Sequence, residues 1–141
     1  MILKLFAPVV MAASMLLASS AHAQEDQRVT DAKAAATTWL ALLDAGKYPE
    51  TWTQSASMFQ TAVTQENWVN VVKPVRAPLG AVMSRTFKTA QFTRSMPAVP
   101  DGEYVVIQYN TVFANKAGAV ETITPMRDKD GQWKISGYFV R

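Results

Sequence analysis

The chain has 141 residues, with 14 lysines and arginines against 11 aspartates and glutamates, a formal net charge of +3. It contains no cysteine and a single histidine, His22. The basic residues are scattered singly, whereas nucleic-acid binding requires a basic patch with interleaved aromatic residues. Composition therefore excludes a nucleic-acid partner, a disulfide scaffold and a thiol nucleophile.

Residues 1–23 have the layout of a cleavable secretory signal peptide. Lys4 supplies the positive charge, residues 5–17 are almost wholly apolar, and a small-residue cleavage sequence ends at Ala23. The apolar segment is shorter than the roughly 20 residues that a membrane-spanning helix needs, and no twin-arginine pair precedes it. We expect export by the general secretory route to the periplasm or medium, with no stable membrane insertion after cleavage.

Cleavage would leave one domain, residues 24–141, without histidine or cysteine. Ser-His-Asp catalysis, a cysteine nucleophile and a typical zinc site all need these residues. The sequence Asp128-Lys129-Asp130-Gly131 resembles the start of a calcium loop, but Phe139 stands where that loop needs a glutamate. We predict a hairpin turn there, and neither a metal nor a cofactor.

The first half of this domain has helical spacing. Apolar residues recur every three or four positions over residues 29–43, and Gly46 is placed to end that helix. A second helix is predicted from Pro49, and a third from the N-cap residue Thr64, closed or kinked at Pro74. Each helix carries one tryptophan on its apolar stripe (Trp39, Trp52 and Trp68), which we predict to lie in the core. Val71, Val72 and Val75 are predicted to share the buried side of Trp68.

From residue 81 onward the apolar period changes to two, which is typical of strands. Strands are predicted over residues 81–96, 103–114, 119–127 and 132–140. Pro125 indicates an edge position or a bulge in the third of them. Helices followed by antiparallel strands predict an α+β fold, with three N-terminal helices packed on a curved four-stranded antiparallel sheet.

This arrangement resembles the cone-shaped fold of the nuclear transport factor two-like superfamily. The residues that carry this resemblance are Leu42-Leu43-Asp44-Ala45-Gly46-Lys47-Tyr48 and Asp130-Gly131-Gln132-Trp133-Lys134-Ile135. The chain also resembles, over nearly all of residues 24–141, a bacterial family catalogued as domain of unknown function 4019. That resemblance is carried by Trp39-Leu40-Ala41-Leu42-Leu43-Asp44, Val75-Arg76-Ala77-Pro78-Leu79-Gly80, Pro100-Asp101-Gly102-Glu103-Tyr104 and Gly137-Tyr138-Phe139. It implies a fold and an exported location, and no catalytic residue.

Glu121 is the one carboxylate flanked mainly by small and apolar residues. The superfamily resemblance implies that a carboxylate in the mouth of the cone could abstract a proton beside a carbonyl, which needs an apolar pocket that raises its pKa. The hydroxyl of Tyr109 or Tyr138 would then polarise an oxyanion. Strand alternation does not decide the face on which Glu121 lies. We favour the alternative, a solvent-face glutamate paired with a lysine or arginine across the sheet.

Two arginines flank the junction between the helical half and the strands. Arg76 and Arg85 would make an anion clamp, because a guanidinium matches a carboxylate or phosphate. Alternatively, Arg76 would bond the free carbonyls at the end of the third helix. An ordinary structural role of this kind is the interpretation we favour for both arginines. The candidate ligand-binding residues are therefore Glu121, Tyr109, Tyr138 and Arg85.

These observations favour a non-catalytic binding module that takes an apolar ligand inside the cone or a protein partner. One alternative is an isomerase- or hydratase-like enzyme that uses Glu121 with a tyrosine. Another is a structural, envelope-associated homodimer formed through the open face of the sheet.

Overall fold

The computed structural model describes residues 13–141. The lysine and much of the apolar segment of the predicted signal peptide lie outside the described residues. The helices are α1 (Ala13–Asp44), α2 (Tyr48–Thr53), α3 (Ser57–Ala62) and α4 (Gln65–Arg76), followed by a 3-10 turn, η1 (Ala77–Leu79). The strands are β1 (Val82–Thr93), β2 (Tyr104–Phe113), β3 (Lys116–Arg127) and β4 (Trp133–Val140).

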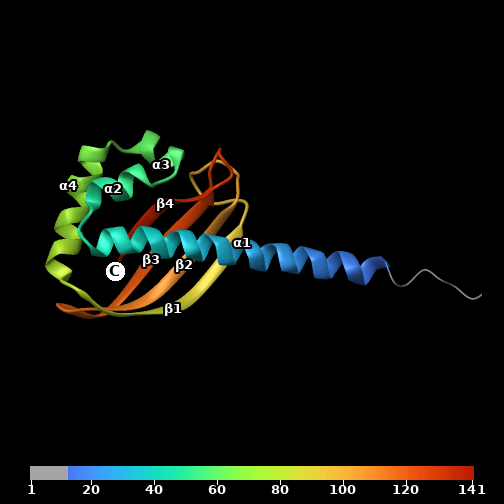
Figure 1. Cartoon of the computed structure of the whole chain (residues 1–141), viewed down its shortest axis with the longest axis horizontal. Helices are drawn as coiled ribbons and strands as arrows, with labels where there is room; N and C mark the ends of the chain where they lie inside the picture. Colours follow the sequence, from blue (N-terminus) through green and yellow to red (C-terminus); the bar gives the residue numbers. More distant parts are fainter. Residues whose placement is uncertain (1–12) are drawn as a thin grey trace, which may run out of the picture.

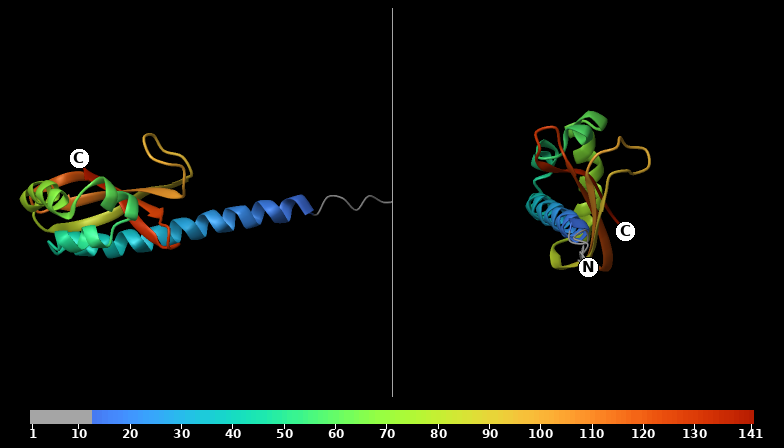
Figure 2. Two further views of the ribbon diagram at one scale, coloured as in Figure 1. Left: turned by 90° about the horizontal axis from the view of Figure 1, so that it is seen from above. Right: turned by 90° about the vertical axis from the view of Figure 1, so that its right-hand side faces the viewer.

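The four strands form one antiparallel sheet in the order β1-β2-β3-β4. Helix α1 crosses one face of the sheet, and α2, α3 and α4 gather beside one end of α1 (Figures 1 and 2). The α+β class with helices on an antiparallel sheet is confirmed. The register of β3 and β4 shifts between Thr124 and Pro125, which confirms a bulge at that proline. In the predicted hairpin turn, the backbone carbonyl of Asp128 accepts a hydrogen bond from the Gly131 amide at 2.9 Å.

The structure has four α-helices among its described residues where we predicted three. The predicted second helix is divided into α2 and α3 by a short linker in which Ala56 is extended, with φ −62° and ψ 151°. The Ala56 amide donates to the carbonyl of Ile135 in β4 at 2.8 Å. A residue that pairs with the sheet edge leaves the helix, and apolar spacing does not reveal such pairing.

Helix α1 begins well before the predicted helix. Residues 20–27 are exposed, and the N-terminal part of α1 projects beyond the sheet (Figure 1). Arg28 joins α1 to the body, because its Nε lies 3.2 Å from the Glu103 carboxylate. None of the described helices is long and apolar enough to cross a membrane.

Helix α4 follows its predicted start but not its predicted buried face. The Thr64 hydroxyl accepts from the Asn67 amide at 3.2 Å, which confirms the N-cap. Trp68 and Val72 are buried, but Val71 and Val75 are 61% and 45% exposed, so their predicted burial is wrong. The reason is that Arg76 continues the buried stripe of α4, which turns both valines toward solvent.

The core lies between α1 and the sheet, and aromatic rings fill its helical end. The Trp39 ring centroid lies 6.1 Å from that of Trp68 and 5.5 Å from that of Tyr138. Phe59 packs edge-on against Trp68 at 5.0 Å. Trp39 and Trp68 are buried, and Trp52 is partly buried and packs against the core cluster, which confirms the predicted core tryptophans. An apolar ligand between the helices and the sheet would have to displace these side chains.

Candidate functional site

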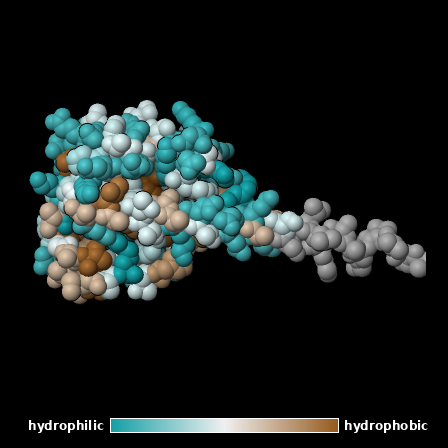
Figure 3. Space-filling model, viewed as in Figure 1, coloured by the Kyte–Doolittle hydropathy of each residue, from teal (hydrophilic) through white to brown (hydrophobic). Residues whose placement is uncertain are grey.

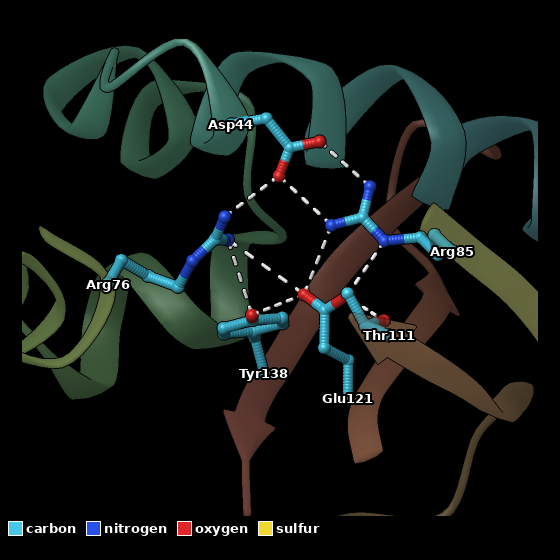
Figure 4. Close-up of polar contacts among 6 residues, drawn as sticks. All are labelled: Asp44, Arg76, Arg85, Thr111, Glu121 and Tyr138. Carbon is cyan, nitrogen blue, oxygen red and sulfur yellow. Dashed lines mark hydrogen bonds and ion pairs between the residues drawn. The ribbon is translucent and has the colours of Figure 1, made fainter. Parts of the chain in front are cut away.

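The strongest polar feature is a network of six side chains, one from each of six elements (Figure 4). Its members are Asp44 at the end of α1, Arg76 at the end of α4, Arg85 on β1, Thr111 on β2, Glu121 on β3 and Tyr138 on β4. The network therefore ties both helix ends to all four strands. We refer to these six residues as the charge network.

Glu121 is the centre of the charge network, and its side chain is 0% exposed. Oε1 accepts from Arg85 Nε at 2.8 Å and from the Thr111 hydroxyl at 2.5 Å. Oε2 accepts from the Tyr138 hydroxyl at 2.5 Å and from Arg85 at 3.2 Å. The expectation of a solvent-face Glu121 is wrong, because these donors compensate the charge that burial would otherwise penalise.

Asp44 receives both arginines at the solvent side of the network. Its Oδ1 accepts from Arg76 and from Arg85, each at 2.9 Å, and its Oδ2 accepts from Arg85 at 2.8 Å. The expectation that Arg76 bonds the free carbonyls of its own helix is wrong, because its guanidinium reaches Asp44 and the Tyr138 hydroxyl instead. Two arginines and two carboxylates make the network electrically neutral.

The two candidate tyrosines have different positions. Tyr138 touches both Glu121 and Arg76, at 2.5 Å and 3.3 Å. Tyr109 lies opposite Glu121 in the register of β2 and β3, and packs edge-on against Phe87 at 6.3 Å. Of these two tyrosines, Tyr138 alone belongs to the charge network, judged by the hydrogen bonds of the described residues.

The network shifts the pKa values of Asp44, Arg85 and Tyr138. Burial acts to raise the pKa of Asp44, but hydrogen bonds from Arg85 and Arg76 outweigh it and lower that pKa below 3.8. Burial and then the charge of Glu121 raise the pKa of Tyr138 well above 10. Burial opposes the charge of Arg85, and hydrogen bonds to Asp44 and Glu121 raise its pKa nevertheless. Asp44 and Arg85 are thereby held ionised, and Tyr138 neutral, at neutral pH.

We predict that the Asp44 contribution to stability disappears in acid. Because its pKa is lower in the folded state, the contribution is present above about pH 4 and is lost as pH falls through the folded pKa. The Asp44→Asn variant should therefore unfold at lower temperature than wild type at neutral pH, with a gap that narrows toward pH 3. Thermal unfolding followed by circular dichroism measures this gap, and Asp31→Asn, an exposed site on α1, is the control. A gap that stays constant with pH would contradict the prediction.

The geometry of Glu121 opposes a role as a general base. A base needs a free lone pair within hydrogen-bond reach of the substrate proton, whereas both Glu121 oxygens are engaged by two donors each. Among residues 13–141, no group of three or more His, Cys, Asp or Glu side chains could hold a metal ion. Within the network, the arrangement is suited to holding charges in place.

A second feature is an open groove of about 1380 Å³ on the opposite flank of α1. One wall is the exposed side of α1 and the start of α2, and the other is the β3–β4 hairpin. Figure 3 shows apolar side chains at the bottom of a hollow on this face, with hydrophilic side chains around it. The lining residues are Asp31, Ala34, Ala35, Thr37, Thr38, Trp39, Ala41, Leu42, Glu50, Gln54, Arg127, Gly131, Gln132, Trp133, Lys134 and Ile135.

Trp133 is the largest side chain of the hairpin wall. Its indole N–H is buried and has no hydrogen-bond partner, and the Arg127 guanidinium lies 5.9 Å from its ring centroid. An unpaired buried donor costs roughly 1–3 kcal/mol. The groove therefore has small side chains on the helix and an aromatic and a cationic side chain on the hairpin wall. Tryptophan and arginine are typical of binding surfaces.

Sequence reasoning missed Asp44 and Thr111, and it did not find the groove. A signal for Asp44 was available, because a carboxylate at the C-terminal end of a helix is disfavoured by the helix dipole. Its presence at the end of α1 indicates a specific cationic partner. Thr111 carries no such signal, since a threonine is ordinary on a strand.

The comparisons with known proteins give one match. No curated protein and no solved structure matches the chain, so the resemblance to the nuclear transport factor two-like cone stays a prediction. The model of a family described as "Protein of unknown function (DUF4019)" matches residues 35–138, a range that includes the whole charge network and most of the groove. The chain therefore belongs to the DUF4019 family.

Proposed function

We propose that this chain is an exported, non-catalytic binding module whose groove takes a segment of a protein partner. The observation that carries the proposal is the open groove of about 1380 Å³ between α1 and the β3–β4 hairpin. Pockets for small molecules have roughly 300–1,000 Å³ and enclose most of the ligand. A larger and open groove suits a polypeptide segment better.

The dimensions of the groove agree with such a segment. Its wall on α1 runs from Asp31 to Leu42, which is about 16 Å at 1.5 Å per residue. An extended peptide covers this length with about five residues. The exposed Ala34, Thr38 and Ala41 on α1 leave room for the side chains of that peptide.

The rims supply charges of both signs. Asp31 and Glu50 lie on the helical side, and Arg127 and Lys134 on the hairpin side. A segment with small or apolar residues at its centre and charges of both signs at its flanks would be complementary. Trp133 would be the anchor, because tryptophan and arginine dominate binding energy at interfaces.

Export and the cone fold belong to the same proposal. Cleavage after Ala23 would remove only part of the projecting portion of α1, because residues 20–27 are exposed and the ion pair of Arg28 with Glu103 would remain. The curved sheet with helices on one face supports the cone of the nuclear transport factor two-like superfamily. Both oxygens of Glu121 already accept hydrogen bonds, which opposes the isomerase alternative. Dimerisation through the open face of the sheet, where Phe139 is 53% exposed, stays a prediction.

Site-specific photocrosslinking in cells tests the proposal. A photoreactive amino acid at Thr38 in the groove should give a discrete heavier adduct in the periplasmic fraction. The same amino acid at Gln91, an exposed position on β1, should give none. Intact mass spectrometry of the same preparation should show a chain that begins at Gln24.

The matched variant is Ala34→Arg, which places a long side chain in the groove and keeps good helix propensity. It should abolish the Thr38 adduct while the melting temperature changes by less than about 2 °C. Equal adducts from Thr38 and Gln91, or an adduct that persists in Ala34→Arg, would reject the groove as the binding site. A chain that retains residues 1–23 would reject export with cleavage.

A further inference from the structure

Two guanidinium groups converge on a single carboxylate at the solvent side of the charge network. Arg76 and Arg85 both donate to Asp44 Oδ1 at 2.9 Å, and Arg85 also donates to Oδ2 at 2.8 Å (Figure 4). The bidentate contact of Arg85, supplemented by Arg76, is the way in which arginines recognise a carboxylate ligand. Here the carboxylate belongs to the chain itself.

Asp44 is the least firmly held charged member of the network. Its side chain is 27% exposed, against 4% for Arg76, 17% for Arg85 and 0% for Glu121. It is the last residue of α1, where the helix dipole disfavours a negative charge. The chain then turns through exposed residues and Gly46, whose φ is +73°. Rotation of the Asp44 side chain would withdraw its carboxylate while the neighbouring Leu43, which is 1% exposed, stays in the core.

Both arginines have partners other than Asp44. Glu121 holds Arg85 at 2.8 Å, and Arg76 bonds the Tyr138 hydroxyl and lies 5.0 Å from the ring centroid of Phe113. With Asp44 withdrawn, the network has two positive charges against the one negative charge of Glu121. A preorganised site with an excess positive charge would face solvent at the place that Asp44 had left.

We propose that Arg76 and Arg85 form a binding site for a carboxylate ligand, and that Asp44 occupies this site when the ligand is absent. A ligand carboxylate competes with Asp44 for the same donors, so Asp44 sets the affinity. The site is distinct from the groove, because none of the six residues of the charge network lines the groove. Failure of the photocrosslinking experiment would therefore not contradict this inference. Likewise, failure of the acetate experiment would not contradict the groove as a binding site.

Chemical rescue tests the site, with acetate as the probe. Removing the carboxylate in Asp44→Ala should lower the melting temperature by about 10 °C, because it leaves two guanidinium groups with the single negative charge of Glu121. Acetate at about ten times its dissociation constant should recover about 5 °C of this loss by binding the folded state. Sodium chloride at the same ionic strength and acetamide, the neutral analogue, should recover none of it.

Matched variants separate site binding from a general salt effect. Asp31→Ala removes an exposed carboxylate from the same helix and should not respond to acetate. Asp44→Asn fills the site with a neutral side chain and should gain less than half of the acetate effect. N-acetylglycine, which resembles the C-terminus of a polypeptide, replaces acetate to identify the source of the carboxylate. If it binds about tenfold tighter than acetate, the ligand is a chain terminus. If the two bind equally, the ligand is a small acid.

Wild-type protein provides the second measurement if Asp44→Ala does not fold. In wild type, acetate should shift the NMR signals of the Arg85 Nε–H group. Because acetate must displace Asp44 there, its affinity should be at least about tenfold weaker than for Asp44→Ala, where both proteins can be measured. Two results would overturn the inference. One is an acetate response no larger than that of chloride in Asp44→Ala, and the other is no saturable shift of Arg85 signals in wild type.

Discussion

Replacing Glu121 with glutamine is expected to destabilise the protein by about 3–5 kcal/mol, which is typical for removing one partner of a buried ion pair. The Glu121 side chain is fully buried, so the amide would leave Arg85 and Arg76 with an uncompensated positive charge. Its NH₂ group would also face a donor where the carboxylate accepted one. Urea unfolding followed by tryptophan fluorescence measures the loss as a lower midpoint.

A matched control and a double mutant give this result its meaning. Glu66→Gln makes the same substitution at an exposed position on α4 and should cost less than about 1 kcal/mol. In the double variant Glu121→Gln with Arg85→Gln, the loss should be smaller than the sum of the two single losses, because the unpaired charge is removed. Additive losses would show that Glu121 and Arg85 do not stabilise one another.

Truncation of Trp39 is the second change with a large expected effect. Trp39→Ala should cost about 3–5 kcal/mol, as is usual for a buried tryptophan, since this side chain is 2% exposed and contacts both Trp68 and Tyr138. Its indole N–H also donates to the Thr51 carbonyl at 2.9 Å. Differential scanning calorimetry of the variant should give a lower melting temperature.

Trp39→Phe separates the ring from the hydrogen bond. Phenylalanine keeps an aromatic ring in the core but loses the donor, so the cost should fall to about 1–3 kcal/mol. If Trp39→Ala and Trp39→Phe were equally destabilised, the hydrogen bond and not the packing of the ring would explain the stability. If neither were destabilised, the assignment of Trp39 to the core would fail.

The fold class was predictable because it depends on local periodicity. The step from helical to alternating spacing near residue 81 marks the boundary between helices and strands, and Thr64 and Pro125 identify a cap and a bulge from their own chemistry. The split between α2 and α3 was not predictable in this way. It depends on the pairing of Ala56 with Ile135, two residues that are far apart in the sequence.

The candidate site was predictable in its members but not in its arrangement. Glu121, Tyr138, Arg76 and Arg85 were all recognised as candidates, yet the favoured positions of Glu121 and Arg76 were wrong. Each was judged beside its sequence neighbours, where a glutamate on a strand or an arginine at a helix end has an ordinary explanation. Burial of these charges is stable only when all partners are present, and that condition is visible only in three dimensions.

The span of the charge network has a consequence for the order of folding. Its members run from Asp44 to Tyr138, so no shorter segment of the chain contains all of them. Contacts of such sequence separation form late, after the local helices and hairpins. Until the sheet closes under α1, these two arginines and two carboxylates remain hydrated. Partly folded chains therefore carry charge at the surface that later becomes interior, which opposes their aggregation.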